Sequence, residues 1–124
     1  MITKSILIID DEDDIREVAQ LTLEAIRGWQ VLIAESGEQG LVIAQVEKPD
    51  AILLDVMMPD IDGITTFKKL KANNLTCNIP VIFLTAKVQT AEKRRFAELG
   101  VKGVIAKPFD PMALPDRVAE ILGW

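Results

Sequence analysis

Five short apolar runs alternate with segments of helical character along the chain. The runs lie at residues 5–9, 30–34, 51–54, 81–84 and 103–106. Each has the length and apolar content of a buried strand. The segments at about 13–26, 37–47, 64–73 and 90–99 favour helices, and a fifth helix is expected near the end of the chain. This alternation indicates βα units around a parallel sheet.

Apolar spacing and local stop signals set the predicted bounds of the first and last helices. The first helix is expected to bury Ile15, Val18, Ala19, Thr22, Leu23 and Ile26. Gly28 then ends it. Asp110 is expected to cap the last helix, with Pro111 in its first turn. Alternatively, the regular helix begins only near Leu114, with Pro115 in its first turn.

The predicted fold class is α/β, a doubly wound five-stranded parallel sheet with five helices. Right-handed crossovers place helices on both faces and give a flavodoxin-like three-layer sandwich. The expected strand order is 2-1-3-4-5, which sets the first and third strands side by side at the switch point. We expect residues 1–124 to form a single domain.

Composition narrows the function classes. The net charge of -5 argues against direct binding of nucleic acid. No apolar run approaches the roughly 20 residues that span a bilayer, and the first ten residues lack the features of a signal peptide. The single cysteine, Cys77, fits a reducing compartment, so a cytoplasmic location without membrane contact is expected. The absence of histidine excludes Ser-His triads, and any phosphohistidine must belong to a partner.

Polar residues follow four of the apolar runs. Asp10 and Asp11 come after the first run, Asp55 after the third, Thr85 after the fourth and Lys107 after the fifth. In an open parallel sheet the ligand site lies outside the carboxyl ends of the strands. These five residues are therefore expected to converge on one patch.

Three carboxylates in one patch repel one another. Two unit charges 4 Å apart cost about 4 kcal/mol at a near-surface dielectric, so such a cluster persists when a cation neutralises it. Oxygen ligands without histidine or cysteine point to Mg²⁺, which can also hold a phosphoryl group. A carboxylate nucleophile would then give an aspartyl phosphate. Asp55 is the best candidate because it stands alone at its strand end, whereas Asp10 and Asp11 are suited to holding the metal.

These motifs resemble the receiver domain of a response regulator in two-component signalling, of the chemotaxis-regulator type. The resemblance is carried by Asp10-Asp11, by the run DVMMPDIDG at 55–63, by Thr85-Ala86 and by Lys107-Pro108-Phe109, and it covers essentially the whole chain. It implies that Asp55 is the phosphoacceptor and that Thr85 binds the phosphoryl group. Lys107 would pair with the phosphoryl oxygens and form a cis peptide bond with Pro108.

The resemblance also implies the metal ligands, the partners and the output. Asp11, Asp55 and the backbone carbonyl of Met57 would ligate Mg²⁺, with Asp10 helping through water. The phosphoryl donor would be a sensor histidine kinase or a histidine phosphotransfer protein, and the output a downstream protein target. The signal would pass through the face formed by the fourth helix, fifth strand and fifth helix. The domain would catalyse only its own phosphorylation and dephosphorylation.

The sequence departs from the family pattern at several positions. Val104 stands where these domains commonly carry a switching aromatic residue, so we expect the output to depend more on movement of the 85–90 loop. Lys102 and Gly103 replace an acidic pair used in one mode of dimerisation. Met57 and Lys87, two residues beyond Asp55 and Thr85, are poor at orienting water, which predicts slow self-dephosphorylation.

Other interpretations remain open at this point. Taken singly, each of these polar residues is also explained as a helix start, a turn or a solvated side chain. Among function classes, a binding-only pseudo-receiver keeps the same residues without the chemistry. An aspartyl-phosphate phosphohydrolase usually has a second acid where Met57 stands, and an FMN protein would not place Asp-Asp-Glu-Asp-Asp after its first strand. The chain is either a stand-alone domain or one domain of a larger regulator or hybrid kinase.

Overall fold

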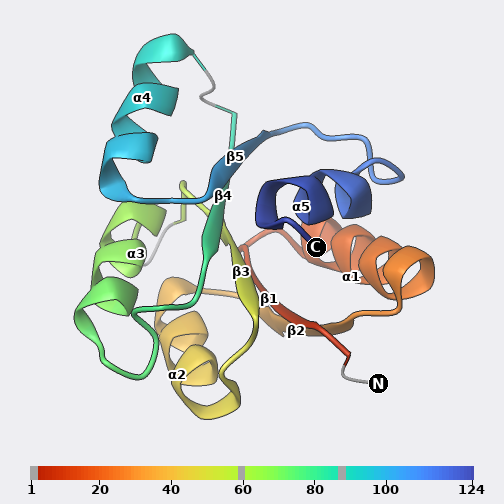
Figure 1. Cartoon of the computed structure of the whole chain (residues 1–124), viewed down its shortest axis with the longest axis horizontal. Coiled ribbons are helices and arrows are strands. Elements are labelled where there is room, and N and C mark those ends of the chain that lie inside the picture. Colours follow the sequence, from red (N-terminus) through yellow and green to blue (C-terminus); the bar gives the residue numbers. More distant parts are fainter. Residues whose placement is uncertain (1–2, 59–60, 87–88) are drawn as a thin grey trace.

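The computed structural model describes residues 3–58, 61–86 and 89–124, and they form one parallel sheet between two helical layers (Figure 1). The strands are β1 (Ser5–Ile9), β2 (Gln30–Ala34), β3 (Ala51–Asp55), β4 (Val81–Thr85) and β5 (Gly103–Ala106). They lie in the order β2-β1-β3-β4-β5, and neighbouring strands are parallel. The predicted fold class and strand order are confirmed.

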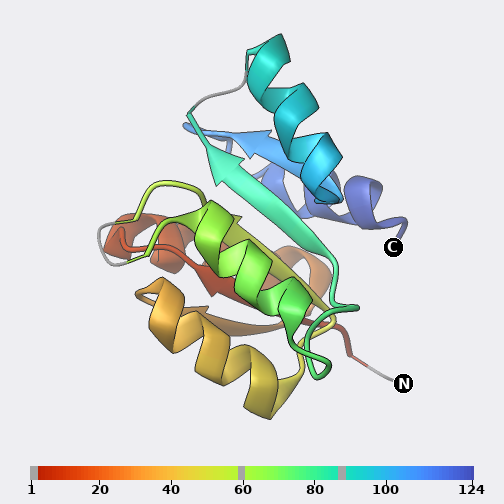
Figure 2. The same ribbon diagram turned by 90° about the vertical axis from the view of Figure 1, so that its left-hand side faces the viewer.

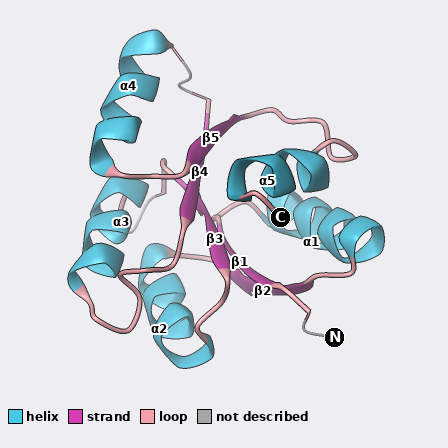
Figure 3. Ribbon diagram, viewed as in Figure 1, coloured by secondary structure: helices cyan, strands magenta, loops and turns pink. Residues whose placement is uncertain are grey.

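The helices lie on both faces of this sheet, as right-handed crossovers require. They are α1 (Asp13–Arg27), α2 (Gly37–Glu47), α3 (Gly63–Ala72), α4 (Thr90–Leu99) and α5 (Leu114–Leu122). Figures 1 and 3 show α1 and α5 on one face and α2, α3 and α4 on the other. The C-terminus lies at the side of the sheet where the strands begin (Figure 2). None of the described helices has the length and apolar character needed to cross a membrane.

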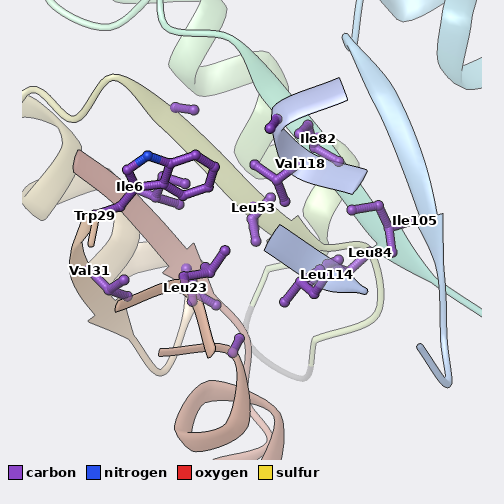
Figure 4. Packing of buried hydrophobic residues seen from close by; sticks show 14 residues of the cluster. Ile6, Leu23, Trp29, Val31, Leu53, Ile82, Leu84, Ile105, Leu114 and Val118 are labelled. Carbon is purple, nitrogen blue, oxygen red and sulfur yellow. The ribbon is translucent and has the colours of Figure 1, made fainter. Parts of the chain in front are cut away.

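The sheet separates two apolar cores because successive side chains of a strand point to opposite faces. Ile6 and Ile8 of β1 belong to the core under α1 and α5, which also holds Leu23 and Val118 (Figure 4). Leu7 and Ile9 belong to the core on the other face. The central strands are covered on both sides, which explains why their sequences are continuously apolar rather than alternating.

Helix α1 ends as predicted, but its buried face differs from the prediction. Gly28 adopts a left-handed conformation with φ of 69°, and its amide donates to the carbonyl of Glu24. Ile26 was expected to be buried and is 43% exposed, and Ile15 and Val18 are only half-buried. The buried residues of α1 are Arg16, Ala19, Thr22 and Leu23.

The start of α5 follows the second of the two predicted alternatives. The regular helix begins at Leu114, with Pro115 in its first turn. Asp110 instead closes a separate turn before the helix. Its side chain accepts a hydrogen bond from the Met112 amide at 3.0 Å, and its carbonyl accepts from the Ala113 amide at 3.0 Å.

Candidate functional site

Four of the predicted site residues lie at the carboxyl edge of the sheet, at the ends of adjacent strands. Asp10 directly follows β1, and Asp55 is the last residue of the neighbouring β3. Thr85 ends β4, and Lys107 directly follows β5. Strand register holds these ends level, because Asp55 pairs with Leu84 and Thr85 pairs with Ala106. The order of the strands thus brings together residues that are far apart in the sequence.

The polar groups of this edge are buried and lie close together. Asp10, Asp55 and Thr85 are 0%, 2% and 1% exposed. The Nζ of Lys107 lies 2.7 Å from Oδ2 of Asp10 and 3.4 Å from Oδ1 of Asp55. A single ammonium group therefore lies between two buried carboxylates, an arrangement that is tolerated only because opposite charges are paired.

Backbone contacts hold Lys107 and Asp55 in place. The Lys107 amide donates to the carbonyl of Thr85 at 2.9 Å, and the Lys107–Pro108 peptide bond is cis, as the family resemblance implied. The Met57 amide donates to Oδ1 of Asp55 at 3.1 Å. The Met57 amide orients the carboxylate of Asp55, and the Lys107 amide ties the start of the loop after β5 to the end of β4.

Gly63 allows α3 to approach the end of β3 closely. A Cβ atom at this position would lie 2.3 Å from the backbone oxygen of Asp55, a distance that no side chain can take without displacing the backbone. The Gly63 amide also donates to the carbonyl of Val56 at 2.8 Å. Glycine is therefore required here for close backbone approach rather than for a positive φ.

The electrostatics of the site favour a cation. Burial, and after it the neighbouring charge of Asp10, raises the pKa of Asp55 to about 7, against the lowering effects of Lys107 and the Met57 amide. Burial alone would lower the pKa of Lys107, but the contact with Asp10 outweighs it and the pKa lies above its usual value. A bound cation would favour the ionised form of Asp55.

The same edge offers oxygen ligands for a metal ion. One carboxylate oxygen from each of Asp10, Asp11, Glu12 and Asp55 lies within 4.8 Å of the others. Oδ2 of Asp10 is buried and accepts no hydrogen bond from the part of the chain described, although it contacts Lys107. An all-oxygen, acidic set fits Mg²⁺.

Sequence reasoning missed two residues of this site. Glu12 was not among the predicted site residues, yet its Oε1 lies 3.5 Å from the Nζ of Lys107, and its place next to the acidic pair was a usable signal. Arg16 is only 6% exposed, and its Nη1 donates to the carbonyl of Asp10 at 2.7 Å. Its signal was a charged residue in phase with Ala19 and Leu23 on the buried face of α1.

The remaining predicted positions lie around this cluster. The side chain of Met57 is 61% exposed, although its amide contacts Asp55. Val104 is half-buried in β5 and packs against the core under α2, α3 and α4. Lys87, which entered the prediction of slow dephosphorylation, lies outside the described residues, as do Pro59 and Asp60.

Comparison with known proteins places the chain in a family. The model of the response regulator receiver domain matches residues 6–119. The chain is 42% identical over 122 residues to the phosphate regulon transcriptional regulatory protein PhoB of Pseudomonas aeruginosa, covering 98% of this chain and 53% of that protein. It is 42% identical over 119 residues to the alkaline phosphatase synthesis transcriptional regulatory protein PhoP of Bacillus subtilis, covering 96% and 48%. The chain thus spans about half the length of these relatives.

Solved structures agree with this placement over the full fold. A putative response regulator from Chloroflexus aurantiacus superposes with a TM-score of 0.88 at 36% identity, covering 99% of this chain and 100% of that one. The chemotaxis protein CheY4 of Vibrio cholerae gives a TM-score of 0.89 at 28% identity, covering 97% and 99%. The chain belongs to the response-regulator receiver domains, the phosphoacceptor signalling domains of two-component systems.

Proposed function

We propose that Asp55 accepts a phosphoryl group from a phosphohistidine of a sensor histidine kinase or a histidine phosphotransfer protein. The supporting observation is the position of the Lys107 ammonium, which lies 2.7 Å from Asp10 and 3.4 Å from Asp55 at the carboxyl edge of the sheet. A carboxylate oxygen of Asp55 forms the new bond to phosphorus as the phosphorus–nitrogen bond breaks. The departing imidazole nitrogen keeps the electron pair of that bond.

The other residues of the edge have supporting roles in this proposal. Asp11, Asp55 and the backbone carbonyl of Met57 would ligate Mg²⁺, and Asp10 would assist through water. When bound, Mg²⁺ supplies positive charge that offsets the phosphoryl oxygens and the acidic cluster. Lys107 pairs with a phosphoryl oxygen, and the Thr85 hydroxyl donates a hydrogen bond to another.

The proposal extends to partners and output. Residues 1–124 act as a single receiver domain that catalyses only its own phosphorylation and dephosphorylation, in the cytoplasm. The signal passes to a downstream protein through the face of α4, β5 and α5, without direct contact to nucleic acid by this domain. Because Val104 has no ring to move, the output depends more on movement of the 85–90 loop, of which residues 87 and 88 lie outside the described residues. PhoB and PhoP are transcriptional regulatory proteins, but the output of this chain depends on whether it stands alone.

Intact mass after incubation with Mg²⁺ and acetyl phosphate tests the assignment. We expect one phosphoryl adduct on the wild type, none without Mg²⁺ and none on Asp55→Asn. Asp50→Asn, which changes an exposed carboxylate at the opposite end of β3, serves as the matched control and is expected to be labelled normally. An adduct that persists in Asp55→Asn would disprove the assignment of the acceptor. Wild-type protein that binds Mg²⁺ but forms no adduct, even with a phosphohistidine donor, would indicate a binding-only pseudo-receiver.

The lifetime of the adduct tests the role of Met57. Its apolar side chain follows Asp55 by two residues and offers no group to orient an attacking water molecule, so the phosphoryl group is expected to be long-lived. Met57→Asn introduces an amide at this position and is expected to speed the loss of the adduct, followed by mass over time. An unchanged lifetime would contradict this role of Met57.

A further inference from the structure

We propose that Arg16 is a positioning residue that holds the Asp10–Asp11 peptide in the orientation required for Mg²⁺ binding. This inference rests on the proposed function, because it concerns the metal affinity of the same acidic edge. Arg16 belongs to α1 and is not itself a candidate ligand, since a guanidinium group cannot coordinate a cation. Its effect on the metal would therefore act through Asp10 and Asp11.

The burial of Arg16 requires an explanation. The residue is 6% exposed and lies on the same face of α1 as Ala19 and Leu23, where an apolar side chain would pack at lower cost. A buried charge is tolerated when it is paired and its donors are used. Two carboxylates supply the pairing: Nη2 contacts Oδ1 of Asp13 and lies 3.8 Å from Oε1 of Glu35. The remaining contact is the one directed at the candidate metal site.

That contact supplies a hydrogen-bond donor to the Asp10 carbonyl, just beyond the end of β1. The strand ends at Ile9, so the Asp10 carbonyl has passed the last paired residue of the sheet. The Asp10 amide donates to Ala34 of β2 at 3.1 Å, and the Asp10 carbonyl accepts from Nη1 of Arg16 at 2.7 Å. Oδ1 of Asp10 accepts from the Glu12 amide at 2.9 Å.

A hydrogen bond that orients the Asp10 carbonyl also restricts the orientation of the Asp11 backbone. The carbonyl of Asp10 and the amide of Asp11 belong to one planar peptide unit. A guanidinium group bonded to that carbonyl and to Asp13 therefore restricts the plane from which both acidic side chains extend. Groups that orient metal ligands in this way commonly change metal affinity by about tenfold to a hundredfold when they are removed.

Positioning and simple charge effects predict opposite signs. If Arg16 acted only through its charge, its removal would make the edge more negative and would strengthen Mg²⁺ binding. If Arg16 holds the Asp10–Asp11 peptide, its removal weakens Mg²⁺ binding despite the more favourable charge. The sign of the change in affinity distinguishes the two.

The experiment measures Mg²⁺ affinity by isothermal titration calorimetry on the whole chain, well below the unfolding temperature. Arg16→Met keeps the length and apolar stem of the side chain and is expected to weaken Mg²⁺ binding about tenfold or more. The matched control is Arg27→Met, which removes the same charge from the last turn of the same helix, where Arg27 pairs with Asp116 at 2.8 Å. This control is expected to bind Mg²⁺ within about twofold of the wild type because its charge is distant and solvent-screened.

A second readout separates positioning from a general loss of structure. Arg16→Met is expected to raise the Mg²⁺ concentration that half-saturates phosphorylation, with a rate near that of the wild type once Mg²⁺ saturates. Unchanged or tighter Mg²⁺ binding by Arg16→Met would overturn the proposal. If that variant does not fold, Arg16→Lys decides instead, since it keeps the charge but cannot serve Asp10 and Asp13 together with a planar fork. Wild-type affinity in Arg16→Lys would then overturn it.

The controls also separate this inference from the proposed function. Asp11→Asn is expected to abolish measurable Mg²⁺ binding, which establishes that the acidic edge is the site. If the wild type itself binds no Mg²⁺, the proposed function fails and the role of Arg16 fails with it. If the wild type binds Mg²⁺, Asp11→Asn does not, and Arg16→Met binds normally, only the role of Arg16 is wrong.

Discussion

A carboxylate at the edge of the sheet where the strands begin and a carboxylate at the edge where they end have opposite surroundings. Asp50, just before β3, is exposed and accepts hydrogen bonds from the amide and hydroxyl of Ser5 at 2.8 and 3.3 Å. Asp55, at the other end of β3, is 2% exposed and accepts from the Met57 amide at 3.1 Å, with a lysine ammonium 3.4 Å away. The carboxylate of Asp50 has hydrogen-bond donors from Ser5 and remains open to water. The carboxylate of Asp55 is buried, and its ionised form depends on a nearby positive charge.

The basic residues of the two edges differ in the same way. At the edge where the strands begin, Lys4 lies 5.0 Å from the ring centre of Trp124, and Trp124 packs edge-to-face on Trp29 at 5.1 Å. At the carboxyl edge, Lys107 is held between buried acids. Contacts such as those of Lys4 contribute modest stability and remain accessible to water. The comparison contrasts one edge whose contacts stabilise the fold with another that holds the charged cluster proposed to bind Mg²⁺.

The largest expected effect comes from exchanging the two lysines for an uncharged side chain. Lys107→Met removes the ammonium group that we propose pairs with the phosphoryl oxygens, and is expected to slow phosphorylation of Asp55 about 100-fold to 1,000-fold. Lys4→Met is the matched control at the other edge and is expected to change the rate less than about twofold. The rate of adduct formation with acetyl phosphate at saturating Mg²⁺ measures both. Equal effects at the two positions would remove the functional distinction between the edges.

The contrast also shows how far the sequence predicted the molecule. Strand ends were predictable because an apolar run buried on both faces stops sharply where a polar residue follows, as at Ile9 and Asp10. Since parallel strands place those ends at one edge, the grouping of Asp10, Asp55 and Lys107 followed. The chemical role of each of these residues was predicted from the family resemblance and not from the apolar pattern.

Other features were not available from periodicity. Ile26 has the helical spacing of a buried residue of α1 and is nevertheless 43% exposed, because burial is decided by contacts with other elements and not by spacing alone. The burial of Arg16 depends on partners contributed by Asp10, Asp13 and Glu35, which a search for apolar faces passes over. Both features depend on contacts between elements, which the local apolar pattern of one helix does not predict.

Two glycines give the next largest contrast. Gly63→Ala would place a Cβ 2.3 Å from the Asp55 backbone oxygen, and is expected to lower the free energy of unfolding by about 3 kcal/mol. Gly28→Ala, between α1 and β2, meets no atom within 4 Å and suffers only from its φ of +69°, with a cost of about 1 kcal/mol. Urea denaturation measures both. Gly63→Ala is also expected to slow phosphorylation, whereas Gly28→Ala is not, and the reverse ranking would contradict the close approach at Gly63.

The pH dependence of stability tests the buried carboxylate. The pKa of Asp55 is raised from 3.8 to about 7 in the folded protein, chiefly by burial. The folded state therefore keeps a proton that the unfolded state releases, so this group lowers stability as pH rises from about 4 to 7. Without metal, Asp55→Asn is expected to be more stable than the wild type at pH 8, because the variant has no carboxylate to ionise in the buried site. The expected difference is about 2 kcal/mol, less than the full pKa shift would give, because neighbouring charges share the titration.

The difference in stability between Asp55→Asn and the wild type is expected to depend on pH and on Mg²⁺. It is expected to vanish below about pH 3, where Asp55 is protonated in both states, and to shrink at pH 8 when Mg²⁺ binds the wild type preferentially. Thermal unfolding in EDTA at both pH values, then with Mg²⁺ at pH 8, follows each change. If Asp55→Asn were more stable than the wild type by the same amount at both pH values, burial of the Asp55 carboxylate would not be the cause, and the interpretation of the structure would be wrong.

The smallest expected effect belongs to the exposed carboxylate at the opposite edge. Asp50→Ala removes the acceptor of the Ser5 amide and hydroxyl, but water can replace it at this exposed position. The expected loss is therefore about 1 kcal/mol in the free energy of unfolding, the typical net value of such hydrogen bonds. The loss should be the same with and without Mg²⁺, and the rate of phosphorylation should not change. A dependence on Mg²⁺ would mean that the two ends of β3 are coupled, and the edges could then no longer be treated as one structural and one functional region.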